Sequence, residues 1–261
     1  MTRPKNRHVA AALLAGVLGL TACGSAPAPP AAPESPAPAA SLGLMTSLPL
    51  YWPLGAAVGD IAAGRAEPPW QRAALEQGFA LEPLDTLSPI PALSPDNPDL
   101  DPLANLTRLA IIQPRGFSPA DNVALDTWVR AGGRLLLVLD PALTGHYDLP
   151  LGDPRLPSRG ALIPPVVARW GMAIRFDDAQ SSKLVDASLG GTWLPLVLSG
   201  EVTIIDPEAA DCTLLASAAA ARCAVGEGQV TLIADAAIFE HPELAGEGGA
   251  ALNAVIRQAL K

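Results

Sequence analysis

The stretch Leu109–Pro141, LAIIQPRGFSPADNVALDTWVRAGGRLLLVLDP, decides the fold class of this chain. It contains two short apolar runs, Leu109–Ile112 and Arg134–Leu139, in which polar and apolar residues do not alternate. Such runs predict strands that are covered on both faces, as in a parallel sheet. Between them, Ser118 and the proline after it predict the start of a helix, and the glycine pair that begins at Gly132 predicts its end. The stretch therefore predicts a βαβ unit with a right-handed crossover.

The helix of this unit has one apolar side, which we expect to pack on the sheet: Ala124, Leu125, Trp128, Val129 and Ala131. We expect Trp128 to anchor the helix there. Asp126 and Arg130 lie on the other side and are spaced to form an i,i+4 ion pair.

Working outward, the flanking segments predict further strands and helices around this unit. We expect strands at 42–47, 79–84 and 172–176, helices at 68–77, 161–170 and 248–260, and short strands at 194–198, 202–205, 212–216, 222–225 and 229–234. Two segments without regular structure are expected, a proline-rich connection at 85–106 and a long loop at 142–160. Residues 41–261 are thus predicted to form a single α/β domain with a mainly parallel sheet, helices on both faces and a β-rich C-terminal part.

The N-terminus has the features of a targeting segment. Three basic residues precede the apolar run Val9–Leu20, which is too short to span a bilayer comfortably. The sequence Leu-Thr-Ala-Cys that ends at Cys23 resembles the lipobox of bacterial lipoproteins. We therefore expect residues 1–22 to be a lipoprotein signal peptide and Cys23 to be the lipidated first residue of the mature chain. The alternative is an ordinary secretory signal in which the cysteine stands by chance.

The predicted location is the periplasmic side of the cell envelope, with the chain anchored by acyl chains such as palmitate. Gly24 stands where an Asp would resemble an inner-membrane retention signal, which favours the outer membrane. Residues 23–40 consist of the lipidated cysteine and a Pro/Ala-rich segment, which predicts a tether between membrane and domain.

Charge excludes two classes of partner. Without the three basic residues of the signal, 14 basic and 26 acidic residues remain, a formal charge of −12. Basic residues form no cluster, so we expect no binding of nucleic acid or of anionic lipid headgroups. The expected partners are the membrane, through the lipid anchor, and an envelope or transporter protein.

The remaining cysteines predict a disulfide, and the remaining histidines do not predict a metal site. Cys212 and Cys223 are expected to form a disulfide, because an exported chain meets an oxidising compartment; the alternative is two free thiols. His146 and His241 are too isolated to predict a metal site, and no cofactor is expected.

Three segments together resemble a known family: the βαβ unit, the end of the next helix (ARWGM) and GEGQVTLIADAAIF. They are similar to the GldG-like auxiliary domains of ABC transport systems and to related bacterial domains of unknown function. The resemblance, which covers roughly residues 41–240, implies a class I glutamine amidotransferase-like or flavodoxin-like fold. It also implies a non-catalytic, periplasmic partner- or ligand-binding domain. Those auxiliary proteins usually carry transmembrane helices, whereas this chain has a lipobox.

No catalytic residue is assigned, because no cysteine or serine stands on a strand-to-helix elbow as amidotransferase or hydrolase chemistry would require. The candidate ligand-binding residues are instead Gln113, Asp140 and Asp235, which end strands, with Arg115 and Arg155 in nearby loops. In open α/β sheets, ligands bind outside the carboxyl ends of the strands. The alternative is that each Asp caps the turn after its strand and that Arg155 forms a local ion pair.

Two functional hypotheses follow. The first is a non-catalytic binding domain beside an ABC-type transport system; the second is a cell-envelope hydrolase that uses Asp140 and Asp235. An open cleft containing both carboxylates would favour the enzyme, whereas hydrogen bonds from backbone N–H groups to both would exclude that use of them. Tyr51-Trp52, next to prolines after the first strand, fits either a sugar or peptide groove or an aromatic plug over the sheet end.

Overall fold

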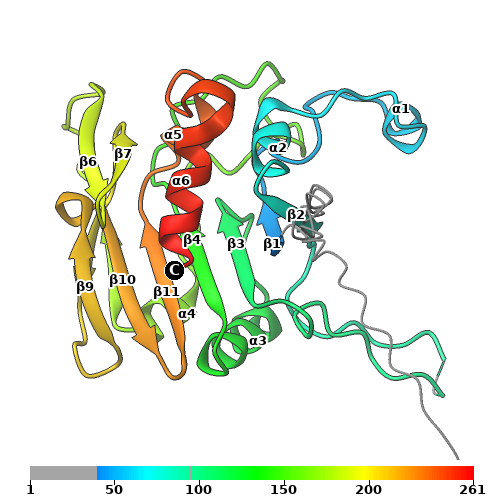
Figure 1. Cartoon of the computed structure of the whole chain (residues 1–261), viewed down its shortest axis with the longest axis horizontal. Helices are drawn as coiled ribbons and strands as arrows, with labels where there is room; N and C mark the ends of the chain where they lie inside the picture. Colours follow the sequence, from blue (N-terminus) through cyan, green and yellow to red (C-terminus); the bar gives the residue numbers. More distant parts are fainter. Residues whose placement is uncertain (1–39, 95) are drawn as a thin grey trace, which may run out of the picture. The chain divides into compact units, whose positions relative to one another are not determined.

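The computed structural model describes residues 40–94 and 96–261. Its centre is a seven-stranded sheet in the order β2-β1-β3-β4-β11-β10-β9 (Figure 1). The first five strands pair in parallel, and β10 is antiparallel to both of its neighbours, β11 and β9. The strands are β1 (Ala40–Thr46), β2 (Phe79–Pro83), β3 (Arg108–Ile112), β4 (Arg134–Val138), β9 (Asp211–Leu215), β10 (Ala220–Val225) and β11 (Gly228–Ile233). This confirms an α/β fold with a mainly parallel sheet. The predicted signal peptide, Cys23 and nearly all of the tether lie outside the described residues.

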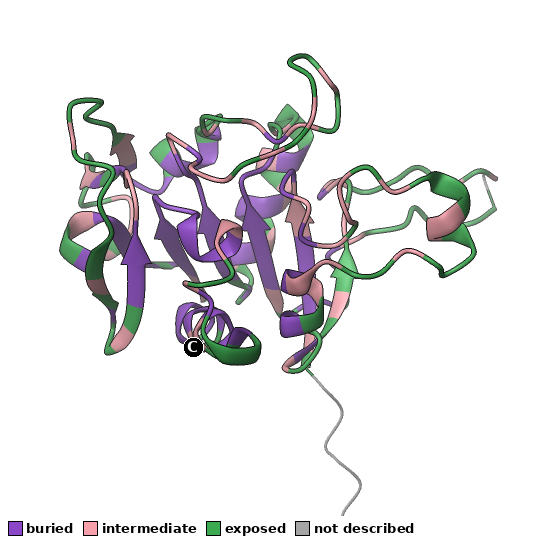
Figure 2. Cartoon of the chain, turned by 90° about the horizontal axis from the view of Figure 1, so that it is seen from above, coloured by how far each residue is buried: buried purple, intermediate pink, exposed green. Residues whose placement is uncertain are grey.

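Helices cover both faces of the sheet. They are α1 (Val58–Ala62), α2 (Trp70–Leu75), α3 (Pro119–Arg130), α4 (Pro165–Arg169), α5 (Ala237–Glu240) and α6 (Ala250–Ala259). Side chains of α2, α5 and α6 share one buried apolar cluster, and those of α3 and α4 share the cluster on the opposite face. Burial is concentrated in the central strands and in the helix sides that face them (Figure 2).

The central strands are apolar on both sides, as their sequence predicts. In β3, Leu109 and Ile111 enter the cluster under α3, while Ala110 and Ile112 enter the cluster under α6. The connection after β1 packs α2 on one face of the sheet, and the connection after β3 packs α3 on the other face, so the two connections diverge between these strands.

Two small two-stranded sheets complete the C-terminal half. One pairs β5 (Met172–Arg175) with β8 (Glu201–Ile204), and the other pairs β6 (Val185–Leu189) with β7 (Thr192–Leu196). The sequence did not predict β6, because its side chains are mostly exposed and carry no apolar pattern. The helix expected at 161–170 is shorter, since Pro164 and Pro165 delay its start.

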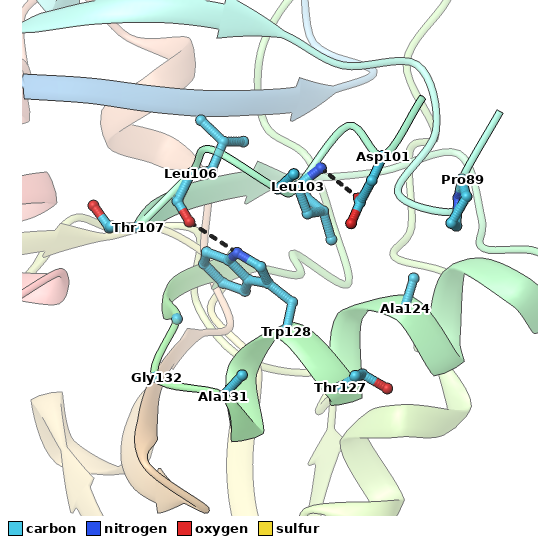
Figure 3. A pocket seen from close by; sticks show the side chains of 12 residues that line it. Pro89, Asp101, Leu103, Leu106, Thr107, Ala124, Thr127, Trp128, Ala131 and Gly132 are labelled. Atoms are coloured by element: carbon cyan, nitrogen blue, oxygen red, sulfur yellow. Dashed lines mark hydrogen bonds between the residues drawn. The ribbon is translucent and has the colours of Figure 1, made fainter. Parts of the chain in front are cut away.

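The crossover helix confirms its predicted cap and corrects its predicted faces. Ser118 and Asp121 form a capping box at the start of α3. Leu125 and Val129 are fully buried on the sheet side, whereas Trp128 is only partly buried and donates its indole N–H to the Leu106 carbonyl at 3.0 Å (Figure 3). Trp128 therefore ties α3 to the segment before β3 and is not the main anchor on the sheet.

Asp126 forms the expected ion pair with Arg130 at 2.9 Å, yet it is buried. The reason is that α4 covers this side of α3. The Asp126 carboxylate also accepts hydrogen bonds from the indole of Trp170 at 2.8 Å and from Arg169 at 2.9 Å.

The disulfide between Cys212 and Cys223 is confirmed. The two residues stand directly opposite each other in the antiparallel β9–β10 pair, with their Cα atoms 4.0 Å apart. In the described residues, no helix is long and apolar enough to cross a membrane.

Candidate site at the carboxyl edge of the sheet

The carboxyl ends of β1, β3, β4 and β11 meet at one edge of the sheet. Ligands of open α/β sheets bind at this edge, where neighbouring connections leave on opposite faces. In this chain that point lies between β1 and β3. The edge therefore holds the candidate site, and the structure shows which of the predicted residues reach it.

Gln113 follows β3 and is fully buried, with a left-handed backbone φ of 46°. Its side-chain amide donates to the carbonyls of Asp140 and Ser158 at 2.9 and 2.8 Å, and its side-chain oxygen accepts from the Asp140 N–H at 2.8 Å. Gln113 thus joins the ends of β3 and β4 to the long loop. Its side chain is committed to these internal contacts.

Asp140 and Asp235 are also brought to this edge, but neither opens into a cleft. Asp140 accepts the N–H groups of Ala142 at 2.7 Å and Ala236 at 2.8 Å. Asp235 accepts those of Ala237 at 2.7 Å and Val197 at 2.6 Å. Both carboxylates therefore cap backbone turns, which is the alternative that the sequence left open. Because backbone N–H groups bind both of them, they cannot act as an exposed catalytic pair.

Asp140 and Asp235 are weaker acids than an ordinary aspartate. Burial raises the pKa of Asp140 to about 7, and burial together with the nearby Asp140 charge raises the pKa of Asp235 to about 8. The hydrogen bonds from backbone N–H groups act in the opposite direction but do not outweigh the loss of solvation.

Arg115 and Arg155 lie away from Asp140 and Asp235. Both line a cavity of about 390 Å³ beside the ends of β1 and β3, together with Tyr51 and Trp52. Arg155 forms the expected local ion pair with Asp153 at 2.7 Å.

A different carboxylate, Glu240 at the end of α5, reaches a cavity at the same edge. This cavity of about 290 Å³ is lined by Leu48, Pro49, Pro53, Leu54, Pro69, Trp70, Gln71, Gly145, His146, Tyr147, Phe239 and Glu240. It combines aromatic walls with a carboxylate, an imidazole and a phenol. We call it the Glu240 cavity.

The Glu240 carboxylate is held from the long loop. Tyr147 donates its hydroxyl to Oε1 at 2.5 Å, while Thr144 donates to Oε2 from its backbone N–H at 3.0 Å and from its hydroxyl at 3.3 Å. A side chain at Gly145 would place its Cβ 2.5 Å from Oε1, so this approach requires glycine. Burial and the hydrogen bond to Glu240 raise the pKa of Tyr147, so the phenol remains a protonated donor.

A histidine is also tied to this arrangement. His241 Nε2 lies 2.9 Å from the Thr144 hydroxyl, and its Nδ1 lies 3.7 Å from a carboxylate oxygen of Glu243. In the part of the chain that the structure describes, no three His, Cys, Asp or Glu side chains are grouped so as to hold a metal ion.

A further cavity lies at the other edge of the sheet. It measures about 490 Å³ and runs between α3 and the segment 101–107 that precedes β3 (Figure 3). Its walls are mostly apolar, and Asp101 is the one titratable residue among those that line it. The Glu240 cavity is therefore the better candidate for chemistry.

The sequence did not single out Glu240, Tyr147 or Thr144 as a group. Glu240 is separated from Tyr147 by 93 positions, and its helix has only four residues. The only sequence signal was the long loop 142–160, which supplies Thr144, His146 and Tyr147.

Comparison with known proteins gives structural matches only. No protein-family model matches the chain, and no curated protein matches it. The chain is similar to an exo-β-1,4-mannosidase from Opitutaceae bacterium strain TAV5, with 11% identity and a TM-score of 0.49. It is also similar to β-galactosidases from Rahnella sp. R3 (12% identity, TM-score 0.47) and Bacillus circulans sp. alkalophilus (12% identity, TM-score 0.46).

Each match covers 85% of this chain but only 36%, 32% and 31% of the respective enzyme, so the chain spans about a third of their length. The three enzymes named above are glycoside hydrolases. This finding contradicts the expectation of a non-catalytic auxiliary domain beside an ABC-type transport system, which is corrected here. At these TM-scores the matches transfer no activity to the chain.

Proposed function

We propose that this chain is a hydrolase of cell-envelope glycans and that the Glu240 cavity is its active site. The observation that carries the proposal is the Glu240 carboxylate, which lines a cavity at the ligand-binding edge and has both oxygens positioned by Tyr147 and Thr144. Positioned acid–base groups in a concave site are the usual mark of such chemistry. This assignment replaces the pair Asp140 and Asp235, because Glu240 lines a cavity whereas the two aspartates are buried and line none of the cavities described above.

The lining residues provide both proton transfers. Glu240 accepts a proton from a water molecule as the water oxygen bonds to the sugar carbon. His146, which also lines the cavity, donates a proton to the leaving oxygen as the carbon–oxygen bond breaks. Trp70 and Tyr147 offer ring faces on which the apolar side of a sugar can stack.

The test is hydrolysis by the wild type and by Glu240→Gln. Purified domain is incubated with peptidoglycan sacculi and with p-nitrophenyl glycosides, and new reducing ends and p-nitrophenol are measured. We expect hydrolysis by the wild type and a loss of about 10²–10⁴-fold in kcat in the variant. Glu247→Gln is the matched control, since Glu247 is exposed and outside the cavity. Absence of hydrolysis by the wild type, or equal rates in Glu240→Gln, would refute the proposal.

Two further assignments are proposed with it. The first is a class I glutamine amidotransferase-like or flavodoxin-like fold, supported by the parallel strand order β2-β1-β3-β4-β11. The second is a periplasmic location with a lipid anchor at Cys23, supported by the lipobox and the signal-like segment before it. Such an anchor would hold a hydrolase next to envelope glycans.

A further inference from the structure

A second cavity adjoins the Glu240 cavity. The cavity of about 390 Å³ that contains Arg115 and Arg155, here called the arginine cavity, lies beside the ends of β1 and β3. Leu48, Pro49, Pro53 and Leu54 line both cavities, so a single segment forms their common wall. The two cavities are therefore neighbours.

The arginine cavity has an aromatic side. The rings of Tyr51 and Trp52 meet edge to face, with centroids 4.9 Å apart, and Trp52 is 48% exposed. The Arg72 guanidinium lies 4.1 Å from the Tyr51 ring centroid and 5.4 Å from that of Trp52, while its Nε pairs with Glu76 at 2.6 Å. These contacts fix the rings and leave about half of the Trp52 surface open. The exposed surface of Trp52 favours a groove for a sugar or peptide over an aromatic plug that covers the end of the sheet.

Two guanidinium groups, those of Arg115 and Arg155, also line the cavity. Arg155 uses its Nε and Nη2 for Asp153, at 3.0 and 2.7 Å, which fixes the guanidinium plane and leaves Nη1 available. Arg115 follows β3 and is exposed, with no ion pair among the described residues. Asp85 is the only carboxylate that lines the cavity. Asp153 offsets the charge of Arg155, so Arg115 and the remaining Nη1 donor of Arg155 are the groups in this cavity that can bind an anion.

We propose that the arginine cavity is a subsite for a sugar that carries a carboxylate. The sugar ring would stack on Trp52, and its carboxylate would accept hydrogen bonds from Arg115 and from Nη1 of Arg155. The inference rests on the proposed glycan hydrolase and assigns to it an acidic substrate, whose next sugar would lie in the Glu240 cavity.

The test measures binding without requiring hydrolysis. Isothermal titration calorimetry compares the trimer of galacturonic acid with its methyl ester, which keeps the shape but lacks the charge. We expect the wild type to bind the acid at least tenfold more tightly, and Arg115→Ala to abolish this preference while leaving binding of the ester unchanged. Trp52→Ala should weaken binding of both. Arg134→Ala, an exposed arginine at the amino end of β4, is the control.

Three results would overturn the subsite. The first is equal affinity for acid and ester, and the second is an unchanged preference for the acid in Arg115→Ala. The third is displacement of the trimer by inorganic phosphate at the same concentration as by galacturonate, which would indicate a simple anion site. The two proposals also fail separately. Acid-selective binding without glycan hydrolysis would refute only the hydrolase, whereas Glu240-dependent hydrolysis without acid selectivity would refute only the subsite.

Discussion

At the scale of single residues, the buried carboxyls Asp140 and Asp235 make stability depend on pH. Their pKa values of about 7 and 8 exceed the ordinary value of 3.8, so the folded state holds protons that the unfolded chain releases above about pH 4. Stability is therefore expected to fall as pH rises from about 5 to 8, by about 1.4 kcal/mol per pH unit for each group up to its own pKa, or roughly 6 kcal/mol for the two together. Urea unfolding at four pH values measures this slope.

Asp235→Asn tests the assignment of that slope. The amide cannot titrate, so the pH dependence between 5 and 8 should flatten. Its NH₂ group would also face one of the backbone N–H donors, which lowers stability at pH 5. Asp178→Asn, on the exposed surface, should change neither quantity. A slope that is unchanged in Asp235→Asn would contradict the assignment.

Asp121 acts with the opposite sign. Burial would raise its pKa, but hydrogen bonds from Ser118, Leu87 and Thr86 outweigh burial and hold the pKa below 3.8. The stability that this group contributes is present above about pH 4 and is lost as pH falls below it. We expect Asp121→Asn to be less stable at pH 5 and to lose less on acidification to pH 2.5, as measured by urea unfolding.

At the scale of elements, the α3–α4 contact depends on one buried acceptor. Asp126 binds the indole N–H of Trp170, which is fully buried, and the guanidinium groups of Arg130 and Arg169. Asp126→Ala leaves the indole without a partner and should cost about 1–3 kcal/mol. A double-mutant cycle with Trp170→Phe, which lacks the N–H, should show a coupling of at least about 0.5 kcal/mol. Strict additivity would mean that this hydrogen bond contributes nothing.

The β9–β10 hairpin offers a second test at this scale. Its disulfide joins directly opposed residues and closes a loop of eleven positions, so its removal should cost on the order of 2–3 kcal/mol. The double variant Cys212→Ser/Cys223→Ser is compared with wild type by urea unfolding, with and without reductant. Equal stability of oxidised and reduced wild type would count against a stabilising role.

The same two scales explain what the sequence could predict. The strands β3 and β4 are apolar after their first residue, and β11 is mostly apolar, which is a local pattern. Gln113, Asp140 and Asp235 were therefore correctly placed at the ends of these strands. Side-chain direction was not predictable, because it depends on backbone N–H groups from distant segments such as Val197. The Glu240 site combines a four-residue helix with a loop more than 90 positions earlier, and no local pattern encodes that contact.

At the scale of the whole molecule, the location of the domain depends on whether the N-terminus anchors it to a membrane. The described domain is predicted to work on an envelope substrate, and the sequence predicts that lipid on Cys23 keeps it there. Cys23→Ser should therefore move the protein from the membrane fraction to the soluble periplasm, while hydrolysis by the purified domain stays unchanged, because the residue is remote in sequence from the Glu240 site. Fractionation and blotting measure the first effect, and reducing-end release measures the second. Retention of the variant in the membrane would show that something other than the predicted lipid holds the protein there.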